Sequence, residues 1–239
     1  MGAFRILVAD DHPVFRFGLC SLLSSHEGWE ICGEAADGRD AVDKCGQLKP
    51  DLLTLDICMP RLNGVDAARQ IMKEKPDQAI LVLTAVDSEQ VVRDCLDAGV
   101  RGWVFKSEGT DALMTAVEAM QQRKTIFSSQ VSDLIMLAYR HRMNPATAKA
   151  PKLSPREREV VQLVAEGKTS KQVAAILNVS ARTAETHRSH ILLKLNLHSI
   201  AELVLYAVKN EIVHVHRSSV LRFPSAETTE LALPLRGIQ

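Results

Sequence analysis

Five polar residues each follow a short apolar run of the kind that forms a buried strand. They are Asp10, Asp11, Asp56, Thr84 and Lys106. Parallel strands place their carboxyl ends at one edge of a sheet, so we expect these side chains to converge there. Three crowded carboxylates repel one another, and a hard cation such as Mg²⁺, which binds carboxylates, water and phosphate oxygens, would relieve that repulsion. Lys106 and Thr84 suit a phosphoryl group, so Asp56 is the candidate nucleophile for an aspartyl phosphate.

The elements that must position these residues alternate along the first half of the chain. Strand-like runs are expected at 6–9, 29–34, 52–55, 79–84 and 102–106, and helical patterns lie between them. A last helical pattern carries Leu113, Val117 and Met120. Strands alternating with helices predict βαβ units and a parallel sheet. The first half is therefore expected to be one complete α/β domain with five strands.

The net charge of zero conceals an asymmetry between the two halves. Residues 1–123 carry 13 Lys and Arg against 20 Asp and Glu, whereas residues 151–213 carry 9 against 6. This distribution predicts that only the second half binds a polyanion.

The cysteine content and the apolar runs indicate where in the cell the protein is expected. The five cysteines are scattered without a C-x-x-C pair, which favours reduced thiols and a cytoplasmic protein. No apolar run approaches the ~20 residues that span a bilayer, so no membrane partner is expected.

The sequence of the second half predicts four helices. Ser154, Pro155 and Glu157 form a capping box with a proline start, and that helix ends at Gly167. A tight turn at 178–180 separates the second helix from a third over 181–195, which is the layout of a helix-turn-helix.

On the third helix, one apolar stripe should face the core. It consists of Ala184, His187, Ile191 and Leu195. The opposite face presents Arg182, Glu185, Thr186 and Ser189, with bases beside them. Such a face suits a DNA major groove, with bases on phosphates and mid-face residues on base edges. A solvated surface helix is the alternative interpretation.

Residues 4–122 resemble a response-regulator receiver domain, through Asp10-Asp11, Asp56…Met59-Pro60…Asn63-Gly64, Thr84-Ala85 and Lys106. The resemblance implies a flavodoxin-like sheet of order 2-1-3-4-5 and a sensor histidine kinase that phosphorylates Asp56. It also implies catalytic roles for Thr84 and Lys106, and Mg²⁺ held by Asp10, Asp11, Asp56 and the backbone carbonyl of Cys58. Trp103 matches the family's aromatic switch position, paired with Thr84; a buried strand aromatic is the alternative.

Residues 153–213 resemble the LuxR-type helix-turn-helix of the NarL/FixJ regulators, through Leu153 to Val160, Glu166-Gly167-Lys168 and Thr183 to Arg188. The resemblance implies contacts to double-stranded DNA, and a homodimer formed through Val204 and Val208. The residues expected at DNA are Lys168, Thr169, Ser170, Arg182, Thr183, Glu185, Thr186, Arg188 and Ser189. The family often has Lys at the position of Glu185, so the resemblance does not predict which DNA sequence the domain binds.

We therefore predict four segments: a receiver domain at 1–123, a partly helical linker at 124–150, an all-α four-helix DNA-binding domain at 151–213, and a tail at 214–239 of unknown structure. The predicted function is a phosphorylation-controlled transcription regulator that is not an enzyme. One alternative is a phosphatase or phosphotransferase with the same Asp and Mg²⁺ chemistry. Another is a phosphorylation-independent DNA-binding protein whose receiver only dimerises.

Overall fold

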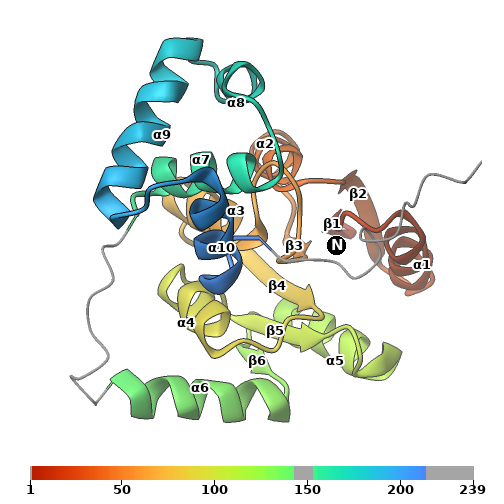
Figure 1. Ribbon diagram of the computed structural model, residues 1–239. Coiled ribbons are helices and arrows are strands. Elements are labelled where there is room, and N and C mark those ends of the chain that lie inside the picture. The colour runs from red at the N-terminus through yellow and green to blue at the C-terminus, as the bar shows by residue number, and fades with distance from the viewer. Residues whose placement is uncertain (1, 143–152, 214–239) are drawn as a thin grey trace, which may run out of the picture.

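A computed structural model describes residues 2–142 and 153–213 (Figure 1). The predicted tail at 214–239 lies outside the described residues. A parallel sheet of six strands runs in the order β2-β1-β3-β4-β5-β6. The strands are β1 (Phe4–Ala9), β2 (Trp29–Ala35), β3 (Leu52–Leu55), β4 (Ala79–Thr84), β5 (Gly102–Phe105) and β6 (Ile126–Phe127).

The helices of the first half connect these strands. They are α1 (Pro13–Ser24), α2 (Gly38–Leu48), α3 (Gly64–Glu74), α4 (Glu89–Asp97) and α5 (Gly109–Gln121), followed by α6 (Ser129–Arg142) after β6. The predicted α/β fold and the strand order 2-1-3-4-5 are confirmed. The expected strand count was wrong by one, because β6 has only two residues, too few to form a recognisable apolar run.

The two faces of the sheet are covered by different helices, because successive side chains of a strand point to opposite faces. On β1, Ile6 and Val8 pack with α1 and α5, while Leu7 and Ala9 pack with α2, α3 and α4. Val131 of α6 belongs to the second of these clusters. The sheet, at whose carboxyl edge Asp10, Asp56 and Lys106 lie, is therefore packed against a hydrophobic core on each face.

The second half folds into four helices around a separate core (Figure 1). They are α7 (Pro155–Ala165), α8 (Ser170–Leu177), α9 (Ala181–Leu195) and α10 (Ile200–Lys209). The capping box at Ser154 and Glu157 is present as predicted, and Thr169 forms a second one with Gln172. These caps satisfy backbone N–H groups that have no intrahelical partner, and so define where each helix begins.

In residues 2–142 and 153–213, no single helix is long and apolar enough to cross a membrane. Helices α9 and α10 reach that length and composition only as a pair, with a bend of 68° between them.

Candidate functional site: an acidic pocket and a helix-turn-helix

The carboxyl ends of β1, β3 and β5 bring Asp10, Asp56 and Lys106 together. Strands β1 and β3 are neighbours, and the Asp56 N–H donates to the Ala9 carbonyl oxygen at 2.9 Å. The Lys106 Nζ atom lies 2.7 Å from Asp10 Oδ2 and 2.7 Å from Asp56 Oδ2. Both aspartates are buried, so one ammonium group bridges two buried carboxylates.

Backbone amides hold both carboxylates in place. Asp56 Oδ1 accepts a hydrogen bond from the Ile57 N–H at 2.7 Å, and Asp10 Oδ1 accepts one from the His12 N–H at 2.8 Å. A Cβ atom at Gly64 would lie 2.1 Å from the Asp56 carbonyl oxygen. Only glycine therefore allows α3 to begin this close to the end of β3.

Burial and charge act together on the pKa values here. Burial raises the pKa of the Asp10 carboxyl, the Lys106 hydrogen bond opposes that rise, and the Asp56 charge adds to it. Burial alone would lower the pKa of the Lys106 ammonium, but the Asp56 and Asp10 carboxylates outweigh that effect and raise it. Lys106 is therefore charged at neutral pH, and it faces more than one carboxylate.

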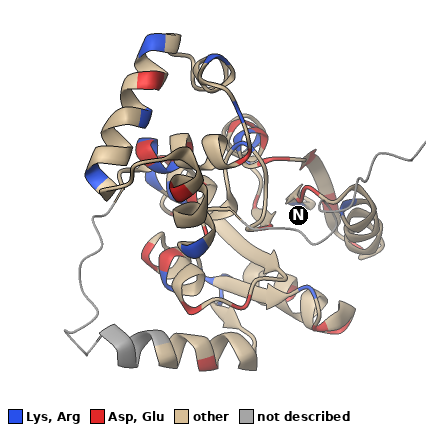
Figure 2. Ribbon diagram, viewed as in Figure 1, with Lys and Arg blue, Asp and Glu red and all other residues tan. Residues whose placement is uncertain are grey.

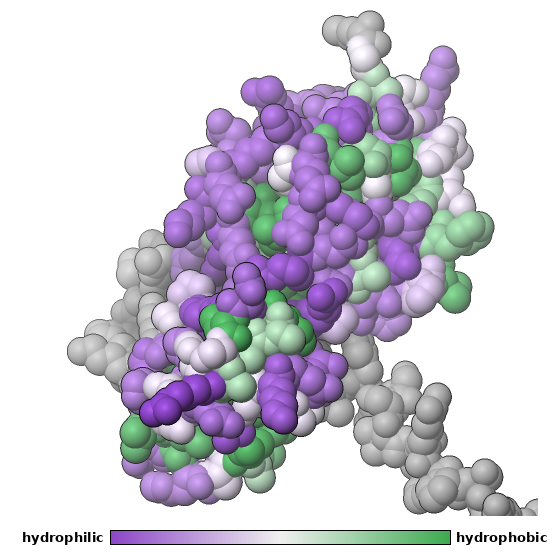
Figure 3. Space-filling model, turned by 90° about the horizontal axis from the view of Figure 1, so that it is seen from above, coloured by the Kyte–Doolittle hydropathy of each residue, from purple (hydrophilic) through white to green (hydrophobic). Residues whose placement is uncertain are grey.

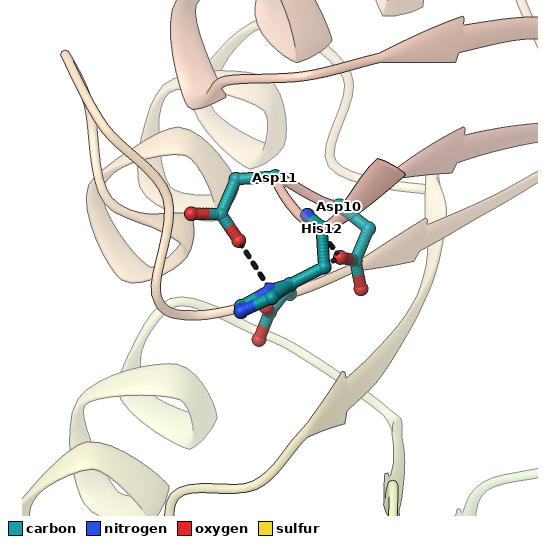
Figure 4. A group of neighbouring side chains, drawn as sticks. Asp10, Asp11 and His12 are labelled. Atoms are coloured by element: carbon teal, nitrogen blue, oxygen red, sulfur yellow. Dashed lines mark hydrogen bonds and ion pairs between the residues drawn. The ribbon is translucent and has the colours of Figure 1, made fainter. Parts of the chain in front are cut away.

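Asp10, Asp11, His12 and Asp56 form a cluster that could hold a metal ion, with one ligand atom from each within 4.8 Å of the others. Figure 4 shows Asp11 and His12 turned toward each other, with His12 Nδ1 2.8 Å from Asp11 Oδ1. That oxygen is buried, and within the described residues it accepts no hydrogen bond. A buried carboxylate oxygen without a hydrogen bond suits a hard cation. His12 was missed from the sequence, although it directly follows Asp11.

A cavity of about 480 Å³ gives access to Asp56. It is lined by His12, Val14, Phe15, Asp56, Cys58, Ala85 and Lys106. The Phe15 ring centre lies 4.6 Å from Lys106 Nζ, a contact that favours the charged ammonium. Cys58, whose backbone carbonyl was predicted as a metal ligand, thus borders the same space as Asp56.

Thr84 and Trp103 lie on neighbouring strands beside this pocket. Thr84 is buried, its Oγ1 accepts a hydrogen bond from the Val86 N–H at 3.2 Å, and its carbonyl accepts one from the Lys106 N–H at 2.9 Å. Trp103 is fully buried and packs edge-on to Phe105, with ring centres 6.3 Å apart. Thr84 thus contacts the backbone of Lys106, and Trp103 lies on β5, the strand that ends just before Lys106.

Helices α8 and α9 form the helix-turn-helix. On α9, Ala184 and Ile191 are buried and His187 and Leu195 half-buried, in keeping with the predicted core stripe. The predicted DNA-facing residues are exposed or half-buried: Lys168, Thr169, Ser170, Arg182, Thr183, Glu185, Thr186, Arg188 and Ser189. Figure 2 shows basic positions spaced along α9 around a single acidic one, and Figure 3, seen from the α8–α9 side, shows a mostly hydrophilic face.

Helix α10 carries the two residues predicted for dimerisation. Val204 is half-buried and Val208 is exposed, while the buried Leu203 and Ala207 pack in the domain core. Leu205 is 69% exposed and extends the same apolar face, although it was not among the residues predicted for dimerisation. This face of α10 is open in the single chain.

Helix α7 is hydrogen-bonded to the loop that follows Asp56. The Asn63 N–H donates to Gln162 Oε1 at 2.8 Å, and Gln162 Nε2 donates to the Met59 carbonyl at 3.0 Å. The Arg61 N–H donates to Glu166 Oε1 at 3.1 Å. Gln162 and Asn63 are buried at this contact. The loop beside the acidic pocket is therefore fixed by the second, helical domain.

Polar and charged groups extend the same interface along α3 and α2. On α3, Gln70 Nε2 donates to Glu159 Oε1 at 2.6 Å, and Arg158 Nε lies 3.3 Å from Asp66 Oδ2. On α2, a guanidinium nitrogen of Arg39 lies 3.2 Å from Glu159 Oε2. Lys168 lines a second cavity, of about 270 Å³, together with Asp11 and Cys58. Lys168, which is expected at a DNA phosphate, thus faces a cavity at the contact between the domains, whereas the predicted reading face of α9 is exposed.

A parallel α/β domain with a buried Asp–Lys–Asp pocket, joined to a helix-turn-helix, defines the class of two-component response regulators. The response regulator receiver domain matches residues 6–118, and the luxR family of bacterial regulatory proteins matches residues 151–207. The response regulator protein VraR of Staphylococcus epidermidis is 31% identical over 88% of this chain and 99% of its own. VraR of Staphylococcus aureus is 32% identical over 87% of this chain and 98% of its own length. The chain belongs to the NarL/FixJ family of response regulators, a family of transcription regulators.

Solved structures agree with this assignment. RcsB of Salmonella typhimurium is 27% identical, with a TM-score of 0.53 over 87% of this chain and 100% of the other. A second RcsB structure, from Salmonella enterica serovar Typhimurium, is bound to a promoter in the presence of the phosphomimetic BeF3⁻. It is 27% identical, with a TM-score of 0.55, and the match covers 86% of this chain and 98% of the other.

Replacing Asp10 by Asn should stabilise the protein in the absence of divalent cations. The raised pKa of Asp10 means that its ionised form is less favourable in the folded than in the unfolded chain, so removing the charge should raise the free energy of unfolding at neutral pH. Thermal unfolding measures this, with the exposed Asp97→Asn as the control. Added Mg²⁺ should raise the Tm of the wild type but not of Asp10→Asn; an equal rise in both would contradict a metal site at Asp10.

Replacing Gln162 by Ala should loosen the contact between the two domains. The variant leaves the Asn63 N–H and the Met59 carbonyl without their partner, and each lost buried hydrogen bond costs about 1 kcal/mol. Small-angle X-ray scattering should show a larger radius of gyration than for the wild type. The exposed Gln90→Ala should change nothing, and an unchanged radius in Gln162→Ala would show that Gln162 does not hold the domains together.

Proposed function

We propose that the chain is a phosphorylation-controlled transcription regulator in which a sensor histidine kinase phosphorylates Asp56. The observation that carries the proposal is the Lys106 ammonium, 2.7 Å from both Asp10 and Asp56 at the edge of a parallel sheet. A structural ion pair needs only one carboxylate. A second carboxylate, a third at Asp11 and an adjacent cavity make a site that suits a phosphoryl group.

The chemistry follows from the roles of the individual atoms. An Asp56 carboxylate oxygen attacks the phosphorus of a phosphohistidine, the P–N bond breaks, and the imidazole leaves and takes up a proton. Lys106 and the Thr84 hydroxyl hold phosphoryl oxygens as charge builds on them. Asp10, Asp11, Asp56 and the backbone carbonyl of Cys58 would hold Mg²⁺, which when bound neutralises the negative charge of the pocket.

Thr84 and Trp103 are the proposed switch residues. The Thr84 hydroxyl oxygen accepts a hydrogen bond from the Val86 N–H at the start of the β4–α4 loop, so a turn of this side chain toward a phosphoryl group would also move that loop. Trp103 lies opposite Val82 in the sheet, close to Thr84 on the same strand pair. Phosphate shifts the population toward the rearranged state only if it interacts more favourably with that state.

The output is binding to double-stranded DNA by a homodimer, through the α9 face and its flanking bases. Glu185, Thr186 and Ser189 are proposed at base edges, and the basic residues with Thr183 at phosphates. The half-buried Val204 and the exposed Val208 of α10 are proposed to pair two copies over two half-sites. A protein with this role acts in the cytoplasm, where its DNA lies, and it turns over no substrate of its own.

Phosphoryl transfer to wild-type protein should tighten specific DNA binding at least tenfold, and Asp56→Asn should abolish that gain. Acetyl phosphate with Mg²⁺ supplies the phosphoryl group, and fluorescence anisotropy over a salt series measures the affinity. The exposed Asp77→Asn is the control and should respond like the wild type. If wild type and Asp56→Asn bind equally under every condition, the receiver acts only as a dimerisation module.

The acidic residue on the reading face predicts a specific charge effect. Glu185→Lys should strengthen binding to non-specific DNA and make the slope of log K against log salt steeper by about 1, because one more cation meets the phosphates. Glu118→Lys makes the same change in net charge on exposed α5 and should leave the slope unaltered. Equal slopes for both variants would place Glu185 away from the DNA.

A further inference from the structure

Trp103 lies beneath a cover formed by the chain's own linker. Strand β6 pairs with β5 so that Phe127 lies opposite Trp103, and the Ser128 N–H donates to the Trp103 carbonyl at 3.3 Å. Val131, in the first turn of α6, is fully buried in the same hydrophobic cluster as Trp103. The side chain at the proposed switch position is therefore enclosed by residues that follow the sheet's fifth strand and lead to the DNA-binding domain.

The cover is held by one face of a helix and a very short strand. Val131, Leu134 and Ile135 recur at helical spacing and belong to or pack on the Trp103 cluster, whereas Met136 is 55% exposed. Helix α6 lies along α4 (Figure 1). Strand β6 adds only two residues to the sheet. Two residues of sheet pairing and one buried helix face attach this segment, whereas the central strands are buried on both faces, so the segment is expected to open at a lower free energy than the core.

The enclosed indole itself destabilises the covered state. Trp103 Nε1 is buried, and within the described residues its N–H has no acceptor. A buried tryptophan usually finds one, as Trp29 does by donating to Gln121 Oε1 at 3.1 Å. Leaving the Trp103 N–H unsatisfied costs free energy, and water would recover it if the cover lifted. The covered state therefore carries a penalty that opening removes.

The covered residues are connected to the acidic pocket by the sheet. Phe105 packs edge-on to Trp103 and lies opposite Thr84 in the β4–β5 pairing. The β4–α4 loop, which Thr84 begins, leads directly into α4, the helix on which α6 rests. A movement of Thr84 therefore reaches α6 by two routes, through the two aromatic rings and through α4.

We propose that β6 and α6 form a cover over Trp103 that opens when the receiver is phosphorylated, and that this opening frees the tether of the DNA-binding domain. The proposal rests on the phosphorylation-controlled function proposed above. It assigns the linker a part in signal transfer: a docked α6 fixes the point at which the chain leaves the receiver, and a released α6 does not.

The first test follows Trp103 directly in the full-length chain. The chain has two tryptophans, so in Trp29→Phe the fluorescence reports Trp103 alone. Adding beryllofluoride with Mg²⁺, a stable phosphoryl mimic, should increase acrylamide quenching of Trp103 at least twofold and speed amide hydrogen exchange over residues 126–137. Asp56→Asn in the same background should show neither change.

The two proposals fail in different ways. If beryllofluoride tightens DNA binding while Trp103 quenching and amide exchange stay constant, the phosphorylation-controlled function stands and the cover is overturned. If beryllofluoride leaves DNA binding unchanged, the phosphorylation-controlled function fails, and the cover proposal fails with it.

A matched pair of variants tests whether opening alone transmits the signal. Leu134→Asp places a charge on the face of α6 that packs on the cluster, and it should tighten DNA binding about tenfold without beryllofluoride. Met136→Asp places the same charge on the exposed face and should bind as the wild type does. Leu134→Asp with a native circular dichroism spectrum and wild-type DNA affinity would overturn the proposal. If Leu134→Asp does not fold, the quenching experiment decides alone.

Discussion

The structure depends on one ammonium group held between two buried carboxylates. Burying Asp10 and Asp56 in adjacent strands is unfavourable unless a countercharge is close, and Lys106 supplies it at 2.7 Å from each. That geometry requires β1, β3 and β5 to end at the same level, which the parallel register and the cores on both faces enforce. The charges are incompletely balanced, since Asp11 adds a third carboxylate. The residual negative charge is what suits the pocket to a cation.

The contact between the domains is polar, whereas the acidic pocket is held between two hydrophobic cores. It is built from hydrogen bonds and ion pairs of Gln162, Glu159, Arg158 and Glu166 with the receiver, while the DNA-binding domain keeps a hydrophobic core of its own. Water can replace polar contacts of this kind when the domains separate, as is common at interfaces between domains. Because the contact includes the loop after Asp56, a change at that residue and the position of α7 are physically linked.

Local patterns were sufficient for most of the fold and for the charged members of the pocket. Apolar runs ending at Asp10, Asp56 and Lys106 predicted the strands, since a buried parallel strand is apolar on both faces. Ser154 and Glu157 predicted the start of α7 because a capping box is a short-range interaction. Strand β6 escaped detection because two residues carry no periodicity, and its place depends on pairing with β5.

The sequence by itself determined which residues meet at the sheet edge, because alternating strands and helices imply a parallel sheet, and parallel strands have their carboxyl ends at one edge. Only the tertiary structure decided that His12 joins the acidic cluster, that α6 packs on α4, and that Gln162 reaches the Met59 carbonyl. Such contacts join residues far apart in the chain. They depend on side-chain direction and polar complementarity, and neither of these leaves a periodic pattern in the sequence. The burial of Trp103 without a hydrogen-bond acceptor is of the same kind, since it depends on what the linker covers.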